Sequence, residues 1–215
     1  MTGKEIKRKI ERWTSVRVEL KGQSLKDISF DWSGASAGVR FNWLKKKAEI
    51  RFPSLDDDQY FPDYVYLKFQ GYALHELGHV WFTACRPWDK ARKVHGGRIS
   101  GFINGLEDVR IEREVIKSGL VKDARGMFEH LVNEFLKIDD YVEPDDEKNI
   151  PFMLAIEGRR RNGYAIKPKT ILSDSVYGYE IFKALRKLDS AENTSQVAQI
   201  AIELQKEIEE IEFIE

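Results

Sequence analysis

Residues 75–79 read His-Glu-Leu-Gly-His, and this short stretch determines how the rest of the chain can be interpreted. On an α-helix, two histidines four positions apart lie one turn apart on the same face, so both imidazoles point the same way. That spacing suits two nitrogen ligands of a tetrahedral zinc ion. Glu76 is rotated by about a quarter turn from His75, so its carboxylate can reach a water at the metal.

The residues on either side of this motif predict a helix over about residues 63–84. Apolar side chains occur nearly all around this helix, which is typical of a buried helix. They are Tyr64, Leu67, Phe69, Tyr72, Ala73, Leu74, Leu77, Val80, Trp81 and Phe82. We expect Cys85, six residues after His79, to lie on the same helix as a small buried side chain.

Alternating apolar and polar residues ahead of the helix predict β-structure. Between residues 28 and 55 the alternation forms three short runs, separated by the small residues 34–38 and by three lysines. This pattern is typical of a hairpin or a three-stranded antiparallel meander. Apolar periodicity predicts further helices at residues 4–20, 98–117, 123–138, 150–161, 174–188 and 194–212. The predicted fold class is therefore α+β, mostly helical, with a small antiparallel β-sheet preceding the helix that carries the motif.

Two connecting segments and the C-terminal region complete the predicted organisation. Residues 86–97 are expected to form a loop, and residues 139–148 an exposed acidic connector. We expect a single domain over residues 1–190, followed by an acidic C-terminal helix over residues 191–215. Asn193 or Thr194 is the expected N-cap of that helix.

The composition of the 215-residue chain is that of a globular protein, with 42% hydrophobic and 33% charged residues. Its 35 basic and 36 acidic side chains leave a formal charge of −1, so no net field attracts nucleic acid. Basic clusters such as Arg159-Arg160-Arg161 are expected to lie on solvated faces. A charged start without a signal peptide, and no run near the roughly 18 apolar residues of a membrane helix, predict a cytoplasmic protein without a membrane partner. The single cysteine rules out an internal disulfide.

A catalytic zinc ion usually has three protein ligands, so a third ligand must come from further along the chain. Glu107 and His95 are the two candidates. On the predicted helix 98–117, Glu107 shares a carboxylate-rich face with Asn104 and Asp108. A buried carboxylate needs a partner such as a metal ion, and Asp108 could accept the second ring N–H of a ligating histidine. This setting favours Glu107 as the ligand, supported by Asn104 and Asp108, and leaves His95 as the alternative.

The two motifs together resemble a known group of proteins. Ala-Leu-His-Glu-Leu-Gly-His-Val-Trp-Phe-Thr at residues 73–83 and Asn-Gly-Leu-Glu-Asp-Val-Arg-Ile-Glu-Arg at residues 104–113 are similar to phage and bacterial metallopeptidase-like proteins. These are related to the peptidase-like part of the cobaltochelatase subunit that carries a von Willebrand A domain, and the wider resemblance is to gluzincin zinc peptidases. It covers about residues 70–165. The resemblance implies a zincin-like domain with His75, His79 and Glu107 as metal ligands and Glu76 as the catalytic base.

These features predict a zinc metallopeptidase that hydrolyses a protein or peptide substrate with Glu76 as general base. One alternative is a DNA-associated protease similar to the SprT family, with His95 as third ligand and the basic clusters on DNA. Another is a phage-type binding or regulatory protein in which zinc only stabilises the helices and Glu76 is dispensable. A phage-encoded protein would act in the host cytoplasm. The substrate, its cleavage site and the oligomeric state are not predicted.

Overall fold

The computed structural model describes residues 1–20, 27–42, 47–135, 145–166, 172 and 175–214, and its fold is α+β, as predicted. Most of the expected helices occur within two residues of their predicted starts, and the acidic connector lies mainly outside the described residues. In chain order the elements are α1 (Gly3–Leu20), β1 (Asp27–Gly34), β2 (Gly38–Asn42), β3 (Lys47–Pro53), α2 (Asp63–Phe82), α3 (Cys85–His95), α4 (Arg98–Ser118), α5 (Ala124–Phe135), η1 (Glu147–Asn149), α6 (Ile150–Arg161), α7 (Gly178–Leu188) and α8 (Thr194–Ile214).

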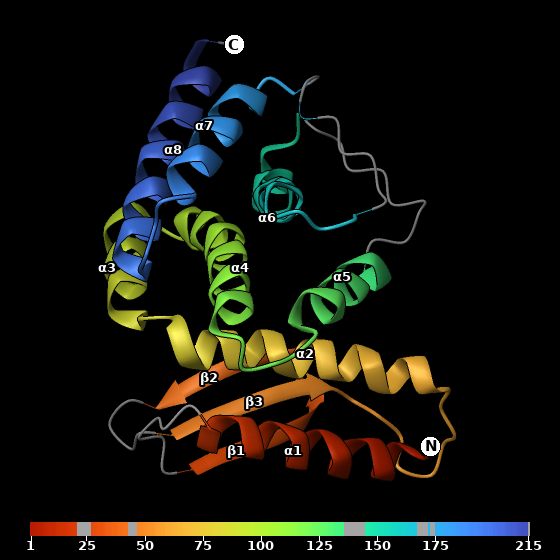
Figure 1. Cartoon of the computed structure of the whole chain (residues 1–215). Helices are drawn as coiled ribbons and strands as arrows, with labels where there is room; N and C mark the ends of the chain where they lie inside the picture. Colours follow the sequence, from red (N-terminus) through yellow and green to blue (C-terminus); the bar gives the residue numbers. More distant parts are fainter. Residues whose placement is uncertain (21–26, 43–46, 136–144, 167–171, 173–174, 215) are drawn as a thin grey trace. The chain divides into compact units, whose positions relative to one another are not determined.

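Internal contacts divide the chain into two compact units. The first comprises Met1–Trp81 and Glu114–Glu134, and contains α1, the strands, most of α2 and α5. The second comprises Phe82–Arg113 and Phe135–Glu215, and contains α3, α6, α7 and α8. Helix α4 begins in the second unit and ends in the first. The labels in Figure 1 identify these elements.

The sheet of the first unit is mixed, which corrects the prediction of an antiparallel sheet. Strand β3 pairs in parallel with β1 and antiparallel with β2, so the strand order is β1-β3-β2. Strands β1 and β2 thus lie about 10 Å apart, since neighbouring strands are separated by about 4.8 Å. The segment between Gly34 and Gly38 can span that distance at about 3.3 Å per residue. Alternation predicts strands but not their neighbours, so it could not reveal that β3 lies between the first two.

One face of the sheet packs against helices. Along β3, Ile50 and Phe52 are fully buried and alternate with partly exposed residues. The Phe52 ring stacks on Trp32 of β1 with centroids 4.5 Å apart, and its centroid lies 6.1 Å from that of Phe69 on α2. Trp32 also donates its indole N–H to a carboxylate oxygen of Glu11 on α1 at 2.8 Å. Helices α1 and α2 therefore cover the same face of the sheet.

Helix α2 also packs closely on α5 within the first unit. A Cβ atom at Gly71 of α2 would lie 3.0 Å from Leu131 Cβ and 3.2 Å from the Met127 carbonyl oxygen. These distances are tighter than normal side-chain contacts, so a residue without a side chain lets the two helices approach. The sheet and α5 thereby fix α2, the element that carries the histidine motif.

Residues 86–97 were expected to form a loop, but most of them belong to α3 (Cys85–His95), which corrects that prediction. Proline is compatible with the first turn of a helix, where its missing N–H has no intrahelical acceptor. Pro87 occupies the first turn of α3, and the helix ends before Gly96, whose φ is 84°. Cys85 accordingly starts a new helix and does not extend α2.

The second unit has its own apolar core, formed by α3, α4, α6, α7 and α8. A Cβ atom at Gly105 of α4 would lie 2.4 Å from the Pro151 carbonyl oxygen of α6, so these two helices approach closely. Although α8 is acidic, it contributes Val197 and Leu204 to the core. Its N-cap side chain is Asn193, whose Oδ1 accepts the Gln196 N–H at 3.1 Å.

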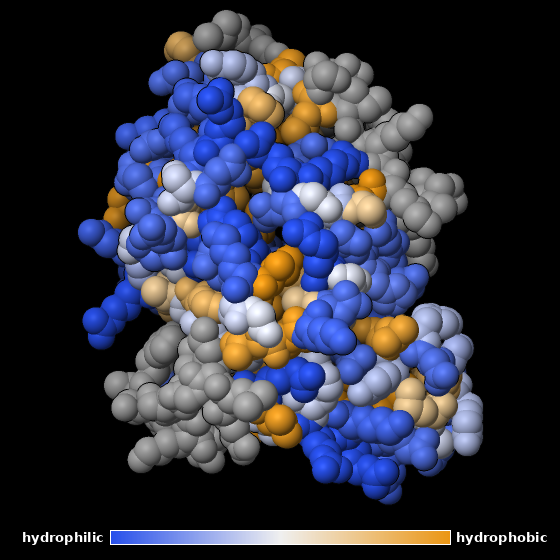
Figure 2. All heavy atoms as spheres, in the orientation of Figure 1, coloured by the Kyte–Doolittle hydropathy of each residue, from blue (hydrophilic) through white to orange (hydrophobic). Residues whose placement is uncertain are grey.

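Hydrophilic side chains predominate on the face of the molecule shown in Figure 2, and apolar side chains appear there in small separate patches. This distribution is normal for a globular protein. Among the helices described, none is both long enough and apolar enough to cross a membrane.

Candidate metal centre

Helix α2 places the two histidines of the motif one turn apart, as the spacing predicts. The imidazole centroids of His75 and His79 are 5.0 Å apart, and the ring planes meet at 81°. His79 is 8% exposed and His75 is partly buried. Glu76 lies on the same helix and is 5% exposed, so its carboxylate belongs to the interior. The prediction that a buried helix carries this motif is confirmed.

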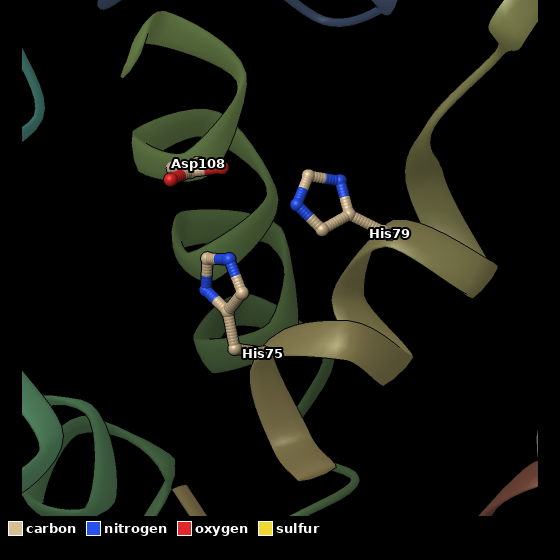
Figure 3. Close-up of side chains that lie close together, drawn as sticks. All are labelled: His75, His79 and Asp108. Carbon is tan, nitrogen blue, oxygen red and sulfur yellow. The ribbon is translucent and has the colours of Figure 1, made fainter. Parts of the chain in front are cut away.

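Among the described residues, one group of side chains is close enough to hold a metal ion. It consists of His75, His79 and Asp108, and one potential ligand atom from each lies within 4.8 Å of the other two. Figure 3 shows both imidazoles projecting from α2 towards the Asp108 carboxylate on α4. The third side chain of the group is thus Asp108, which the sequence predicted to support the ligands and not to bind the metal.

Asn104 and Arg159 both approach the Oδ2 atom of the Asp108 carboxylate. Asn104, one turn earlier on α4, donates from its side-chain amide at 3.4 Å. The guanidinium of Arg159 on α6 lies 3.8 Å away, and the Asp108 side chain is 14% exposed. Both contacts are longer than a strong charge-assisted hydrogen bond. Asn104 was predicted to support the site and does contact Asp108, whereas nothing in the sequence pointed to Arg159.

Glu107, the favoured third ligand in the sequence, is not part of this group. Its side chain is fully buried, and Arg110 holds both carboxylate oxygens, with Nε–Oε2 at 2.8 Å and Nη2–Oε1 at 2.6 Å. The Thr194 hydroxyl donates to Oε1 at 2.8 Å. Successive helical residues point about 100° apart, so Glu107 and Asp108 face different surroundings. The structure thus gives Glu107 a protein partner of opposite charge.

The sequence did not predict the contacts that Arg110 and Thr194 make with Glu107. Arg110 is 1% exposed and also donates to the Phe82 carbonyl at the end of α2, at 2.8 Å. Thr194, besides contacting Glu107, accepts the Ala84 N–H at 2.8 Å. The sequence signal for Arg110 was its position three residues after Glu107, which allows a helical ion pair. No signal linked Thr194 to this helix, because it is far away in the chain.

His95, the alternative third ligand, lies at the last position of α3 and not in a loop. It is partly buried, and its backbone carbonyl accepts the Gln205 side-chain amide at 3.4 Å. It is not a member of the group that contains His75 and His79. The structure therefore does not bring the three histidines together.

The donor chemistry of the group fits a divalent transition metal. Two imidazole nitrogens and one carboxylate oxygen are the protein ligands of a common type of catalytic zinc site, which keeps a further position open. With bonds of about 2.0–2.2 Å, a tetrahedral zinc ion holds its ligand atoms about 3.4 Å apart. Rotation of the side chains can bring atoms that lie within 4.8 Å to that separation. Two histidines and one carboxylate also suit iron(II), so measured metal content must distinguish the two ions.

Comparisons with known proteins add no relative to this picture. No protein-family model matches the sequence, and no curated protein or solved structure matches it significantly. The functional interpretation therefore depends on the residues of this chain and on their geometry.

Proposed function

We propose that this protein is a zinc-dependent peptidase in which His75, His79 and Asp108 hold the metal and Glu76 is the general base. The observation that carries the proposal is that the three ligand atoms lie within 4.8 Å of one another. Glu76, which directly follows His75 in the sequence, is also buried. Hydrolysis of a protein or peptide substrate is inferred from the resemblance of the two motifs to metallopeptidase-like proteins. A cytoplasmic location belongs to the same proposal.

The proposed chemistry divides between the metal and the protein. A bound zinc ion would supply Lewis acidity, which polarises a carbonyl group and makes water more acidic. Glu76 would accept the proton of the attacking water on its carboxylate and later deliver it to the nitrogen of the leaving amine. Its position directly after His75 keeps this carboxylate near the ligands without making it one of them.

The proposed site keeps the two histidine ligands and the general base Glu76 that the family resemblance implies. It differs in the third ligand, which is Asp108 instead of the preceding residue, Glu107. Glu107 is held by Arg110 and Thr194, so binding a metal would require it to give up a buried ion pair. Asp108 lies in the group with the histidines, and its contacts with Asn104 and Arg159 are longer than those of Glu107 with Arg110. The local chemistry therefore favours Asp108.

Metal content and one isosteric substitution test this proposal. The purified protein is analysed by plasma emission for zinc and iron, and its cleavage of unfolded protein substrates is followed by gel and mass spectrometry. Glu76→Gln should keep zinc at the wild-type level and lose turnover, because the amide cannot accept the proton. Glu11→Gln, which alters a carboxylate on α1 that contacts Trp32, is the matched control and should cleave normally.

The outcomes separate the alternatives. Full cleavage by Glu76→Gln would remove this residue from the reaction. Zinc binding without cleavage by the wild type would support a zinc-stabilised binding protein instead. Cleavage that requires DNA, falls steeply with salt and disappears in His95→Ala would support the DNA-associated alternative. Iron without zinc would replace the peptidase proposal by a different chemistry.

A further inference from the structure

Three consecutive arginines close helix α6, and each has a different partner. Arg160 pairs with Glu157 on its own helix, and Arg161 lies 2.5 Å from Asp189 near the surface. Arg159 differs from both, because its side chain is only 9% exposed and it contacts α4. The basic cluster therefore contains one buried cation and is not simply a solvated face.

The guanidinium of Arg159 is held mainly by Glu112. Its Nε and Nη2 atoms donate to the two carboxylate oxygens of Glu112 at 2.9 and 2.6 Å, and Nη1 donates to the Ala155 carbonyl at 3.4 Å. Glu112 is 1% exposed, so this two-bond ion pair is buried. The same Nη2 atom lies 3.8 Å from Oδ2 of Asp108.

This arrangement puts one cation between two carboxylates of α4. Asp108 and Glu112 are four positions apart, so they share one face of the helix, where like charges repel. Burial lowers the pKa of Arg159, but the neighbouring carboxylates of Glu112 and Asp108 raise it further, so the net pKa lies above its ordinary value. The side chain is therefore a permanent charge, and its planar fork has a fixed direction.

We propose that Arg159 is a positioning residue for the metal centre, whose guanidinium, clamped by Glu112, holds Oδ2 of Asp108 and orients that carboxylate as a ligand. This inference rests on the proposed function, because it requires Asp108 to bind the metal. Glu112 takes both short hydrogen bonds, so the guanidinium directs Asp108 from 3.8 Å without engaging it in a competing bidentate pair. The Asn104 amide approaches the same oxygen, so two donors define one side of the carboxylate.

The variants must separate an effect on the metal from an effect on folding. Arg159→Gln alone would leave Glu112 buried without its partner, which can prevent folding. The double variant Arg159→Met with Glu112→Gln removes both charges and leaves no buried ion unpaired. Arg159→Lys keeps a charge but cannot form the two-bond fork. Arg161→Gln is the matched control, because it removes a neighbouring guanidinium that is more exposed and contacts Asp189 and the Phe182 ring.

Zinc affinity is measured by competition with a coloured chelator, and the visible spectrum of the cobalt(II)-loaded protein reports ligand geometry. Urea unfolding of the metal-free proteins shows which variants are folded. The double variant and Arg159→Lys should bind zinc about 10–100-fold more weakly than the wild type, the usual cost of losing a group that orients a ligand. Their cobalt spectra should change as well. Arg161→Gln should match the wild type in both measurements.

The possible failures are distinguishable. If the wild type and Arg161→Gln bind zinc but the folded variants at Arg159 bind it equally well with an unchanged cobalt spectrum, this inference is overturned and Arg159 only joins α6 to α4. If the wild type takes up no zinc at all, the proposed function fails and this inference fails with it. Should the double variant not fold, the Arg159→Lys measurements decide.

Discussion

Helices α2 and α4 both bury ionisable side chains, but those of α2 belong to the histidine motif, whereas those of α4 form ion pairs with arginines. On α2, Glu76 and His79 are 5% and 8% exposed in a helix whose buried residues are otherwise almost all apolar. On α4, Glu107 and Glu112 are 0% and 1% exposed, and each forms a two-bond ion pair with an arginine. The buried glutamates of α4 are thus neutralised by arginines, whereas Glu76 and His79 belong to the proposed metal site.

The difference separates side chains that maintain the fold from those suited to a ligand. A carboxylate paired with a buried guanidinium is costly to remove, because its partner then remains as an uncompensated buried charge. Asp108 lies between the two paired glutamates of α4, but its contacts with Asn104 and Arg159, at 3.4 and 3.8 Å, are longer than the bonds of those pairs. It is also the residue of α4 that belongs to the group with His75 and His79.

The largest expected effect is on stability, from Glu107→Gln. We expect the free energy of unfolding to fall by about 3–5 kcal/mol, since the substitution leaves the charge of Arg110 buried without its partner. Zinc affinity of the folded fraction should stay within a few-fold of the wild type. Urea unfolding in the presence of a chelator measures the first quantity, and chelator competition the second.

Two further variants control this measurement. Glu114→Gln removes a carboxylate whose partner Lys117 is well exposed, and its stability loss should be much smaller. Replacing both members of the buried pair, with Glu107→Leu and Arg110→Met, should recover much of the loss. If Glu107→Gln instead abolished zinc binding at unchanged stability, the ligand implied by the family resemblance would be correct and the distinction within α4 would fail.

Asp108→Asn should show the reverse pattern. We expect zinc affinity to fall by at least about 100-fold, beyond the 10–100-fold typical of residues that only orient a ligand. The stability of the metal-free protein should change little, because Arg159 keeps its main partner, Glu112. Isothermal titration and chelator competition measure the affinity, with Glu107→Gln as the paired comparison. Unchanged zinc binding in Asp108→Asn would remove this residue from the metal centre.

The sequence was sufficient for the histidine motif on α2 but not for the choice of ligand on α4. The spacing of His75 and His79 and the apolar residues around them predicted both the helix and its burial. On α4, neighbouring carboxylates point about 100° apart, so the orientation of the helix about its axis decides which one faces the histidines, and the local sequence does not specify that orientation. Some partners of these carboxylates also lie far away in the sequence. Thr194, for example, contacts Glu107, and no local sequence pattern predicts that contact. The strand order was hidden for the same reason, since alternation reports burial but not pairing.

A smaller effect is expected from Tyr72 on α2, where burial raises the pKa of the phenol to about 12. The unfolded chain ionises near pH 10, so between about pH 10 and 12 it loses a proton that the folded chain retains. Stability should therefore fall as pH rises through this range, by about 1.4 kcal/mol per pH unit from this group. Tyr72→Phe removes that loss, and urea unfolding at about pH 9 and pH 11 measures it.

The control for this pH dependence is Tyr179→Phe, since Tyr179 is 75% exposed and the substitution should leave the alkaline loss of stability unchanged. An identical alkaline loss in the wild type and Tyr72→Phe would mean that Tyr72 ionises normally. In that case burial on α2 would leave the ionisation of this side chain unperturbed, and the contrast with α4 would be weaker than the burial indicates.

The smallest effect should come from Asn104→Ala. Asn104 is exposed on α4, and its amide reaches Oδ2 of Asp108 at 3.4 Å, a long and therefore weak hydrogen bond. We expect zinc affinity to fall by less than about tenfold, below the effect expected for Arg159, which is buried and charged. Asn133→Ala on α5 is the matched control and should leave the affinity unchanged. A loss of zinc affinity as large as that of Asp108→Asn would show that Asn104 is as important for metal binding as the Asp108 carboxylate. The metal centre would then depend on two side chains of α4 and not on one.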